Sequence, residues 1–456
     1  MTLDEVLGGR LAVWGMGAEG SAVVALARAR GLDPLLIDDH PERLGTPPGG
    51  GGAAGPVVLP SEVPWSDIDV VVRAPGVSRY RPELAVAEAA GVTVTTGMAI
   101  WLDDYRDAPV LAVTGTKGKS TTASLAAAVL RAGGLDVELL GNIGVPVLDT
   151  YGRGPADAYV VEVSSYQAAD VTTSPGVVVL TSLAPDHLDW HGGIEQYYRD
   201  KLRLVTAGPA PALAVSAGNP EALRRTAGLP NRTLYGPDGR VVVSADGHIE
   251  ADGCVLADVA DLRAPGRHNA WNLCGALAGC LLLTGSVPAP AAVADALSGF
   301  DGLPSRCRTV GERDGRTYVD DALASNPFAS AASVETFADR PLTVIVGGAD
   351  RGVDPAPLAL ALSAHRPPPT VVVLAPDGGR VAAMLTGETG PSSRTGQTVV
   401  LMADGLADAV AQAVAHTPQG GVVLFSPGAP TPDGGGGYRE RSRQFIEAAG
   451  FGHPDH

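Results

Sequence analysis

The residues with the clearest chemical potential lie between Gly115 and Thr122, in the run Gly-Thr-Lys-Gly-Lys-Ser-Thr-Thr. An apolar stretch from Leu111 to Thr114 precedes the run and an Ala/Leu-rich stretch from Ala123 to Arg131 follows it, which predicts a strand–turn–helix unit. Backbone N–H groups at such a helix start bind anionic oxygens, while Lys119 can reach the β- and γ-phosphates and the Ser120 hydroxyl can hold Mg²⁺. The spacing between the glycines is shorter than in the usual phosphate loop. The sequence predicts an ATP site formed by Gly115, Thr116, Lys117, Gly118, Lys119, Ser120 and Thr121.

Further side chains suited to metal or phosphate chemistry follow two later apolar runs. Glu162 lies near the end of the predicted strand Tyr159–Val163, where a buried carboxylate is costly unless it is paired or binds a metal. After the predicted strand Val177–Ser182, residues 186–191 hold two aspartates and two histidines, which suit contacts around Mg²⁺ or phosphate. A polar loop with a capping aspartate is the alternative interpretation of this motif. Lys201, in a helical run, is by itself typical of a solvated surface lysine.

The composition indicates a globular protein with two to four domains, since the chain has 456 residues, 45% of them hydrophobic and 18% charged. The net charge of −17 argues against a general nucleic-acid binder, so anionic substrates would need local basic pockets. The four cysteines form no Cys-x-x-Cys pair, which favours buried thiols in a reducing compartment. No signal-peptide pattern and no membrane-spanning apolar run is found, so we expect a cytoplasmic protein that interacts with neither membranes nor nucleic acids.

The first of three α/β blocks resembles a nucleotide-binding βαβ unit. The strand Leu11–Trp14 leads through the glycine-rich turn Gly15–Gly20 to the helical run Ser21–Arg30, and a second strand, Leu35–Asp38, ends in acidic residues. The Gly/Pro-rich stretch Gly45–Pro60 is predicted to be a surface loop. The strand Val70–Arg73 then leads into the turn Ala74–Val77, which could present backbone amides to a phosphate.

The second block starts near Met98 and the third near Leu303. A more β-like stretch, Thr233–Leu262, precedes a predicted helix, Asn269–Leu283. Alternating strands and helices predict an α/β fold with open parallel sheets and ligands at the strand carboxyl ends. We expect three domains: a nucleotide-binding Rossmann-like domain (1–97), a central ATPase-type parallel sheet (98–302) and a C-terminal Rossmann-like domain (303–456). The remaining strands are predicted at Ala212–Val215, Thr317–Val319, Leu342–Val346, Thr370–Leu374, Val399–Met402 and Gly421–Phe425.

Besides the phosphate loop, the chain contains in order Gly141-Asn142-Ile143-Gly144, Glu162-Val-Ser-Ser-Tyr-Gln, Asp186-His187-Leu188-Asp189, Lys201, Gly266-Arg267-His268-Asn269 with Asn272, and Arg306 with Asp321. This ordered set of motifs spans essentially the whole chain and resembles the Mur ligases of peptidoglycan precursor synthesis. The first block is similar to the short UDP-binding domain of the members that add glutamate to UDP-N-acetylmuramoyl-L-alanine.

This resemblance implies that ATP phosphorylates the alanyl carboxylate and that the glutamate amine then attacks the acyl phosphate. Lys119 and Mg²⁺ would neutralise the γ-phosphoryl charge. Ser120 and Glu162 would hold one Mg²⁺, and His187 a second together with Lys201, which is carbamylated in this family. Asn142 would touch the substrate or the reacting centre. The nucleotide would also contact Asn269, Arg306 and Asp321, and the UDP-linked substrate Gly15, Gly17, Asp38, Pro75 and Gly76.

The C-terminal block departs from the usual glutamate ligase where the amino acid binds. Leu323 and Arg351 replace familiar lysines, and Thr431 follows an unusual Ser-Pro-Gly-Ala-Pro run. Because a guanidinium fork and an ammonium bind a carboxylate differently, these changes favour the branch that adds L-glutamate, with a separate epimerase acting later. Drift of a D-glutamate pocket is the alternative. The expected glutamate contacts are Ser325, Arg351, Thr431 and Tyr438.

Three other classes fit less of the sequence. A folylpolyglutamate synthetase lacks a UDP-binding N-terminal domain, whereas this chain has the nucleotide-type unit Leu11–Asp39. A dehydrogenase leaves Lys119 and His187 without a role. A non-enzymatic ATP-binding module would not need Glu162, His187 and Lys201 together. We expect the ligase to be a monomer.

Overall fold

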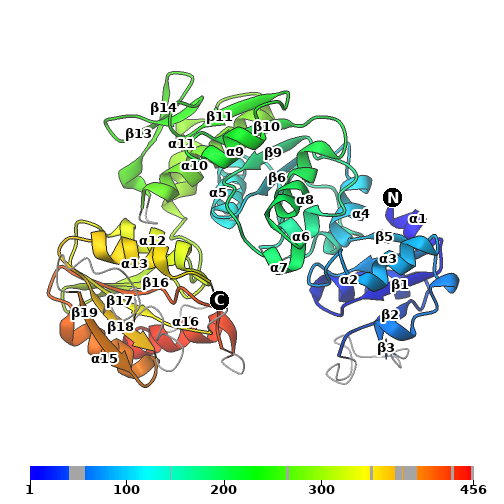
Figure 1. The fold of residues 1–456 in the computed structure, drawn as a ribbon. Coiled ribbons are helices and arrows are strands. Elements are labelled where there is room, and N and C mark those ends of the chain that lie inside the picture. Colours follow the sequence, from blue (N-terminus) through cyan, green and yellow to red (C-terminus); the bar gives the residue numbers. More distant parts are fainter. Residues whose placement is uncertain are drawn as a thin grey trace. The chain divides into compact units, whose positions relative to one another are not determined.

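The computed structural model describes residues 1–40, 57–143, 145–262, 266–349, 353–374, 383, 398–432 and 436–452. The strands form three sheets, with helices packed against them (Figure 1). The chain divides into two compact units, of which the first comprises Met1–Val259 with Trp271–Ala296 and the second Ala260–Ala270 with Leu297–His456. The predicted α/β class with parallel-rich sheets is confirmed.

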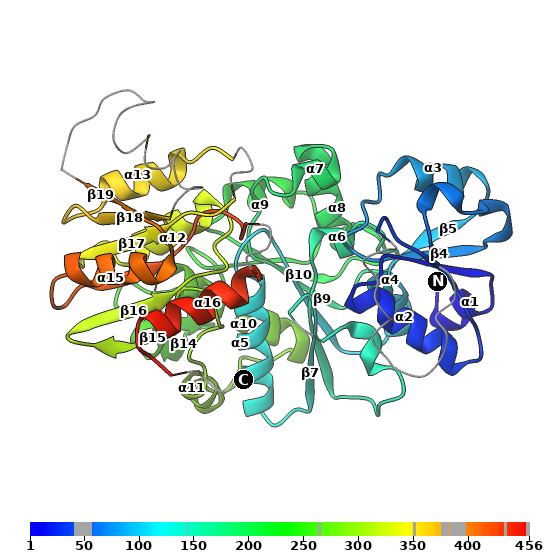
Figure 2. The same ribbon diagram turned by 90° about the horizontal axis from the view of Figure 1, so that it is seen from below.

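The first sheet, in the first unit, is parallel with the strand order β3-β2-β1-β4-β5. Alternate residues of β1 pack on opposite faces, because Leu11 and Val13 contribute to one core cluster and Ala12 and Trp14 to another. Helices α1 and α2 cover the first face and α3 the second (Figure 2). The elements are α1 Leu3–Leu7, β1 Leu11–Trp14, α2 Ala18–Ala29, β2 Leu35–Ile37, β3 Val57–Val58, η2 Pro60–Glu62, η3 Trp65–Asp67, β4 Val70–Arg73, α3 Pro82–Ala89 and β5 Thr93–Thr95.

The predicted loop Gly45–Pro60 is wrong at its end. Val57 and Val58 form strand β3, because their extended backbone pairs with β2 at the sheet edge. Residues 45–56 of that predicted loop lie outside the described residues.

The second sheet has the order β14-β13-β12-β11-β10-β9-β6-β8-β7 and places β6 between β8 and β9. Its strands are parallel from β7 to β12, and β12, β13 and β14 pair antiparallel, in the stretch predicted to be β-like. The strands are β6 Val110–Thr114, β7 Val137–Gly141, β8 Ala158–Glu162, β9 Val177–Leu180, β10 Ala212–Ser216, β11 Arg232–Tyr235, β12 Val241–Val243, β13 His248–Ala251 and β14 Cys254–Asp258. The helices are α4 Gly97–Asp104, α5 Lys119–Ala132, η4 Val147–Thr150, α6 Ser165–Ala168, α7 Leu188–His191, α8 Ile194–Thr206, α9 Pro220–Arg225, η5 Val259–Asp261, α10 Arg267–Thr284 and α11 Pro290–Ser298.

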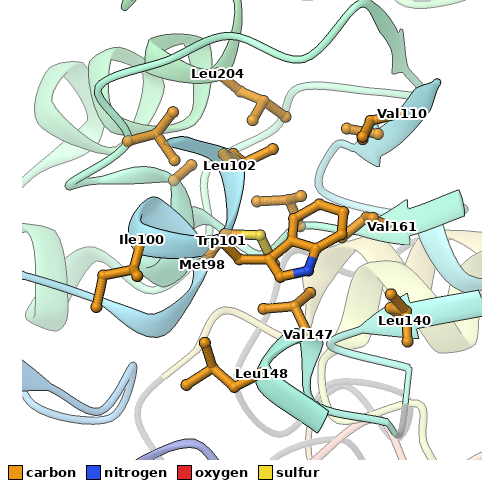
Figure 3. Packing of buried hydrophobic residues seen from close by; sticks show 14 of the residues in the cluster. Met98, Ile100, Trp101, Leu102, Val110, Leu140, Val147, Leu148, Val161 and Leu204 are labelled. Atoms are coloured by element: carbon orange, nitrogen blue, oxygen red, sulfur yellow. The ribbon is translucent and has the colours of Figure 1, made fainter. Parts of the chain in front are cut away.

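One hydrophobic cluster joins the first two sheets, since it contains both Val13 of β1 and Ala112 of β6. Trp101 of α4 lies in this cluster near Met98, Val147 and Leu148 (Figure 3). Its indole N–H donates to the Thr150 hydroxyl at 2.9 Å, so the polar edge of this buried ring is satisfied. The continuous core explains why the first two sheets form one compact unit.

The third sheet, in the second unit, has the order β15-β16-β20-β17-β18-β19 and is parallel except for the β15–β16 pair. Helices α12 and α13 cover one face, and α15 and α16 cover the other (Figure 1). In the described part of the chain, no helix is long and apolar enough to cross a membrane. The elements are β15 Arg308–Arg313, β16 Arg316–Asp320, α12 Pro327–Thr336, β17 Leu342–Val346, α13 Ala356–Ala364, β18 Thr370–Leu374, β19 Val399–Ala403, α15 Leu406–His416, β20 Val422–Phe425 and α16 Gly437–Ala448.

Candidate active site

The predicted phosphate loop connects the end of β6 to the start of α5. Gly115 has a φ of +147° and Gly118 a φ of +87°, values that L-residues with side chains rarely adopt. A Cβ atom on Gly115 would overlap the Thr181 hydroxyl, and one on Gly118 would overlap the Asn272 side-chain oxygen. The glycines therefore allow both the loop conformation and its close approach to the rest of the site.

Hydrogen bonds hold this loop against the segment that follows β9. The Thr116 N–H donates to the Ser182 carbonyl at 2.8 Å, and the Lys117 N–H to the Ser182 hydroxyl at 2.9 Å. The Thr116 hydroxyl donates to the Ala184 carbonyl at 3.0 Å and lies 2.8 Å from the Tyr197 hydroxyl. Contacts within the protein thus fix the loop, which reduces the entropic cost of binding a phosphate.

Lys119 is the first residue of α5, and its ammonium donates to the Thr116 carbonyl at 3.1 Å. This contact holds the side chain over the loop that precedes it. Both the ammonium and the helix N-terminus favour negative charge at this position.

Glu162, at the end of β8, is fully buried, and both oxygens of its carboxylate accept hydrogen bonds. The Ser120 hydroxyl donates to Glu162 Oε2 at 2.6 Å, and the Asn142 amide donates to Oε1 at 2.9 Å. The Asn142 backbone N–H also donates to the Glu162 carbonyl at 3.0 Å. Parallel pairing brings these residues together, because β7 and β8 end side by side next to the loop.

Lys201 is not a solvated lysine, and the interpretation of this residue taken alone is wrong. It is 2% exposed and donates to the Gly115 carbonyl at 2.9 Å. Burial, with the nearby charge of Lys119, lowers the pKa of Lys201 well below its ordinary value. An amine in this setting loses its proton more readily and then becomes a nucleophile.

His187 lies at the same end of the sheet, after β9, and its side chain is half exposed. Burial, together with the charges of Lys201, Lys119 and Lys117, lowers the pKa of His187, and Asp186 opposes this effect. The Lys117 ammonium lies 3.7 Å from Asp186. Among the described residues, no three His, Cys, Asp or Glu side chains are grouped closely enough to hold a metal ion. The metal ligands predicted from the sequence also include the Ser120 hydroxyl and Lys201.

Sequence reasoning missed two buried polar networks in the first unit. In one, His191 of α7 links Ser165 to Asp200. In the other, Arg73 at the end of β4 donates to the Tyr166 carbonyl at 2.9 Å and pairs with Asp170. No spacing rule reveals such contacts, because the partners come from different elements.

The predicted contacts for the UDP-linked substrate lie at the carboxyl ends of the first sheet's strands. Gly15, with a φ of +89°, directly follows β1, and a Cβ atom there would lie 2.9 Å from the Cβ of Ala74. The Met16 N–H donates to Asp38, just past β2, at 3.3 Å. The Pro75 carbonyl, past β4, accepts from the Trp190 indole N–H at 3.1 Å. Gly17 and Gly76 are exposed in these turns.

In the second unit, Asp321 follows β16 and is buried. Its carboxylate accepts from the Ser333 hydroxyl at 2.6 Å, the Ser426 hydroxyl at 2.7 Å and the Cys307 N–H at 3.0 Å. Burial raises the pKa of Asp321 to about 7. Arg306 is half-buried and lies just before β15. Asn269 also belongs to the second unit.

The predicted glutamate contacts also come from the second unit. Ser325 is exposed after β16, Thr431 is half-buried after β20, and Tyr438 lies in the first turn of α16. The loops after β17 and β20 are joined, because the Ala349 N–H donates to the Pro430 carbonyl at 2.8 Å. The predicted contact Arg351 lies outside the described residues.

Comparison with known proteins matches residues 113–280 to the Mur ligase middle domain. A protein from Micromonospora sp. named UDP-N-acetylmuramoyl-L-alanine--L-glutamate ligase is 42% identical over 471 residues, which cover 100% of both chains. A protein of the same name from Salinispora tropica is 40% identical, over 98% of this chain and 99% of its own. The chain belongs to the Mur ligase family. The membership predicted from the ordered motifs is confirmed.

The Mur ligase fold extends over the whole chain. A MurF ligase from Thermotoga maritima, solved in complex with ADP, matches 98% of this chain and 95% of its own with a TM-score of 0.60. Its sequence identity is 16%, so this likeness concerns the fold alone.

Proposed function

We propose that this Mur ligase joins L-glutamate to UDP-N-acetylmuramoyl-L-alanine in an ATP-dependent step of peptidoglycan precursor synthesis. The observation that carries the proposal is the convergence of Lys119, Glu162 and buried Lys201 at the phosphate loop. The full-length relatives bear the name of this reaction, including the L configuration, which agrees with the expectation from the altered C-terminal motifs.

The alanyl carboxylate attacks the γ-phosphorus of ATP, forming an acyl phosphate and releasing ADP. The glutamate amine then attacks the acyl carbon, and the C–O bond to phosphate breaks as the amine loses a proton. The loop N–H groups and the Lys119 ammonium stabilise the charge of the transferring phosphoryl group. Asn142, whose amide donates to Glu162, would orient the reacting carboxylate.

The oxygen donors at this site fit Mg²⁺. The Ser120 hydroxyl and the Glu162 carboxylate lie within hydrogen-bond distance of each other, and Mg²⁺ prefers such hard oxygen ligands. Bound Mg²⁺ would offset the negative charge of the phosphates. His187 would contribute a neutral imidazole to a second ion. Carbamylation would give Lys201 an oxygen ligand, and the lowered pKa of its amine favours that modification.

The remaining assignments complete the proposal. The turns after β1, β2 and β4 bind the UDP-linked substrate, and the loops of the second unit bind L-glutamate and part of the nucleotide. We assign the domain boundaries 1–97, 98–302 and 303–456, in a monomeric cytoplasmic enzyme. We expect a separate epimerase to act later on the L-glutamate of the product.

The test is ADP release by the purified full-length chain in the presence of ATP, Mg²⁺, UDP-N-acetylmuramoyl-L-alanine and L-glutamate. We expect ADP and phosphate in a 1:1 ratio with the UDP-linked dipeptide, and loss of the dipeptide when any substrate is omitted. ATP hydrolysis that proceeds at the same rate without forming the UDP-linked dipeptide would contradict a ligase.

A further inference from the structure

His191 links the two segments that carry Glu162 and Lys201. It ends α7 and is 2% exposed. Its Nδ1 lies 2.6 Å from Asp200 Oδ2, and its Nε2 lies 3.0 Å from the Ser165 hydroxyl oxygen. Ser165 begins α6, just after the strand that ends at Glu162, and Asp200 directly precedes Lys201 on α8. The His191 side chain therefore connects the segment that follows Glu162 with the helix that carries Lys201.

The roles of the hydrogen bonds follow from the partners. An ionised carboxylate only accepts, so Nδ1 donates to Asp200, which leaves Nε2 able to accept from the Ser165 hydroxyl. Ser165, His191 and Asp200 thus have the order of a hydrolase triad. Because Ser165 is 3% exposed, its hydroxyl has no access for a substrate, and the three residues act as a brace between helices.

The brace extends to the phosphate loop and to the segment between β4 and α3. The His191 ring packs edge-on against Tyr197 at 5.2 Å, and the Tyr197 hydroxyl lies 2.8 Å from the Thr116 hydroxyl. On the other side, Asp200 Oδ1 accepts from the Tyr80 hydroxyl at 2.7 Å. The position of α8 relative to the loop is therefore set by several contacts that meet at His191 and Asp200.

We propose that His191 is a positioning residue of the ligase: it fixes α8 against α6, so that Lys201 stays at the Gly115 carbonyl beside Glu162. The proposal rests on the proposed roles of Lys201 and Glu162 in binding Mg²⁺ and phosphate. Groups that support a metal site without touching the metal affect affinity or activity by about 10- to 100-fold when replaced.

The test uses the full-length His191→Asn, which retains a polar atom near the Nδ1 position but none near Nε2. We expect kcat to fall about 10- to 100-fold and the half-saturating Mg²⁺ concentration to rise by a similar factor. KM for L-glutamate should stay within about twofold, because the proposed glutamate contacts lie in the other unit. Hydrogen exchange of residues 115–118 without substrates should accelerate, a readout independent of turnover.

Two further variants separate positioning from general stability. Ser165→Ala removes one bond of the brace at nearly constant volume and should show the same pattern more weakly. His365→Asn is the matched control, since His365 is a similarly buried histidine that bonds the Pro367 and Phe337 carbonyls in the other unit. It should lower the melting temperature and leave kcat and Mg²⁺ dependence unchanged.

The inference is overturned if His191→Asn and Ser165→Ala keep wild-type kcat, Mg²⁺ dependence and hydrogen exchange. It is also overturned if His191→Asn and His365→Asn both lose only stability. Lys201→Ala distinguishes these failures from that of the proposed function. An inactive Lys201→Ala beside an unaffected His191→Asn rejects the brace alone, whereas a fully active Lys201→Ala rejects the proposed role of Lys201.

Discussion

Replacing Glu162 by Gln should separate the stability of the fold from its chemistry. The substitution is nearly isosteric and removes one negative charge from a fully buried position. The glutamine side-chain oxygen can still accept from the Asn142 amide. Its NH₂ group can donate to the Ser120 hydroxyl, so that this hydroxyl accepts a hydrogen bond instead of donating one. Since each such bond contributes about 0.5–1.5 kcal/mol, the free energy of unfolding should change by about 1 kcal/mol or less.

The effect on catalysis should be much larger. Two unit charges about 4 Å apart interact by about 4 kcal/mol at an effective dielectric constant of 20. A free-energy change of this size corresponds to roughly a thousandfold change in a rate or binding constant. Partial compensation by water reduces this, so we expect kcat/KM for ATP to fall by about 10²- to 10³-fold, with a higher half-saturating Mg²⁺ concentration. ADP release at varied Mg²⁺ and urea unfolding of the same preparation measure the two effects.

Asp103→Asn is the matched control, because Asp103 is a buried carboxylate of the same unit that accepts from Thr172 at 3.0 Å and from Thr173. It should lower the free energy of unfolding by about 1–3 kcal/mol and leave turnover unchanged. A Glu162→Gln enzyme with wild-type rate and Mg²⁺ dependence would refute the assigned role of this carboxylate.

Three other substitutions have distinct expected outcomes. Lys119→Ala should lower turnover by about 10²- to 10³-fold, measured as phosphate release, while the melting temperature changes little; a folded variant with normal release would reject the phosphate role. Lys201→Ala should lose most activity, and short carboxylic acids should restore part of it by supplying the missing carboxylate; full activity without carbonate would exclude the carbamate. Burial raises the pKa of Asp321 to about 7 in the folded chain, above the ordinary value of 3.8. Protonation of Asp321 therefore stabilises the fold by up to about 4 kcal/mol below about pH 4. This contribution is lost as the pH rises to about 7. Asp321→Asn should remove that dependence, so its unfolding free energy relative to wild type should rise between pH 5 and pH 8; a constant difference would contradict the raised pKa.

The sequence predicted the parts of the site that depend on local pattern. The phosphate loop was recognisable because its glycines, Lys119 and Ser120 lie between an apolar strand and a helix. Glu162 was recognisable because an acidic residue at the end of a buried strand needs a partner. The third sheet's strands Leu342–Val346 and Thr370–Leu374 were predicted at their observed bounds because their apolar runs are continuous.

Contacts between elements could not be predicted in this way. Lys201 looks like a surface lysine because a single helical position does not reveal which face is covered, and only the family resemblance indicated its role. The contacts of His191 were missed because its partners lie on two other helices. Arg73 was predicted only as the last residue of the strand Val70–Arg73, and nothing in the sequence indicated that its side chain is fully buried and paired with Asp170. Long-range pairing of this kind depends on topology rather than on spacing along the chain.

The configuration of the added amino acid tests the central claim most directly. The full-length enzyme is incubated with ATP, Mg²⁺, UDP-N-acetylmuramoyl-L-alanine and an equal mixture of L- and D-glutamate, one enantiomer carrying a heavy isotope, and the UDP-linked dipeptide is weighed by mass spectrometry. Because the wrong enantiomer leaves a charged carboxylate unmatched, discrimination should be steep. We predict a product that contains almost entirely L-glutamate; a product that contains mainly D-glutamate would contradict the account.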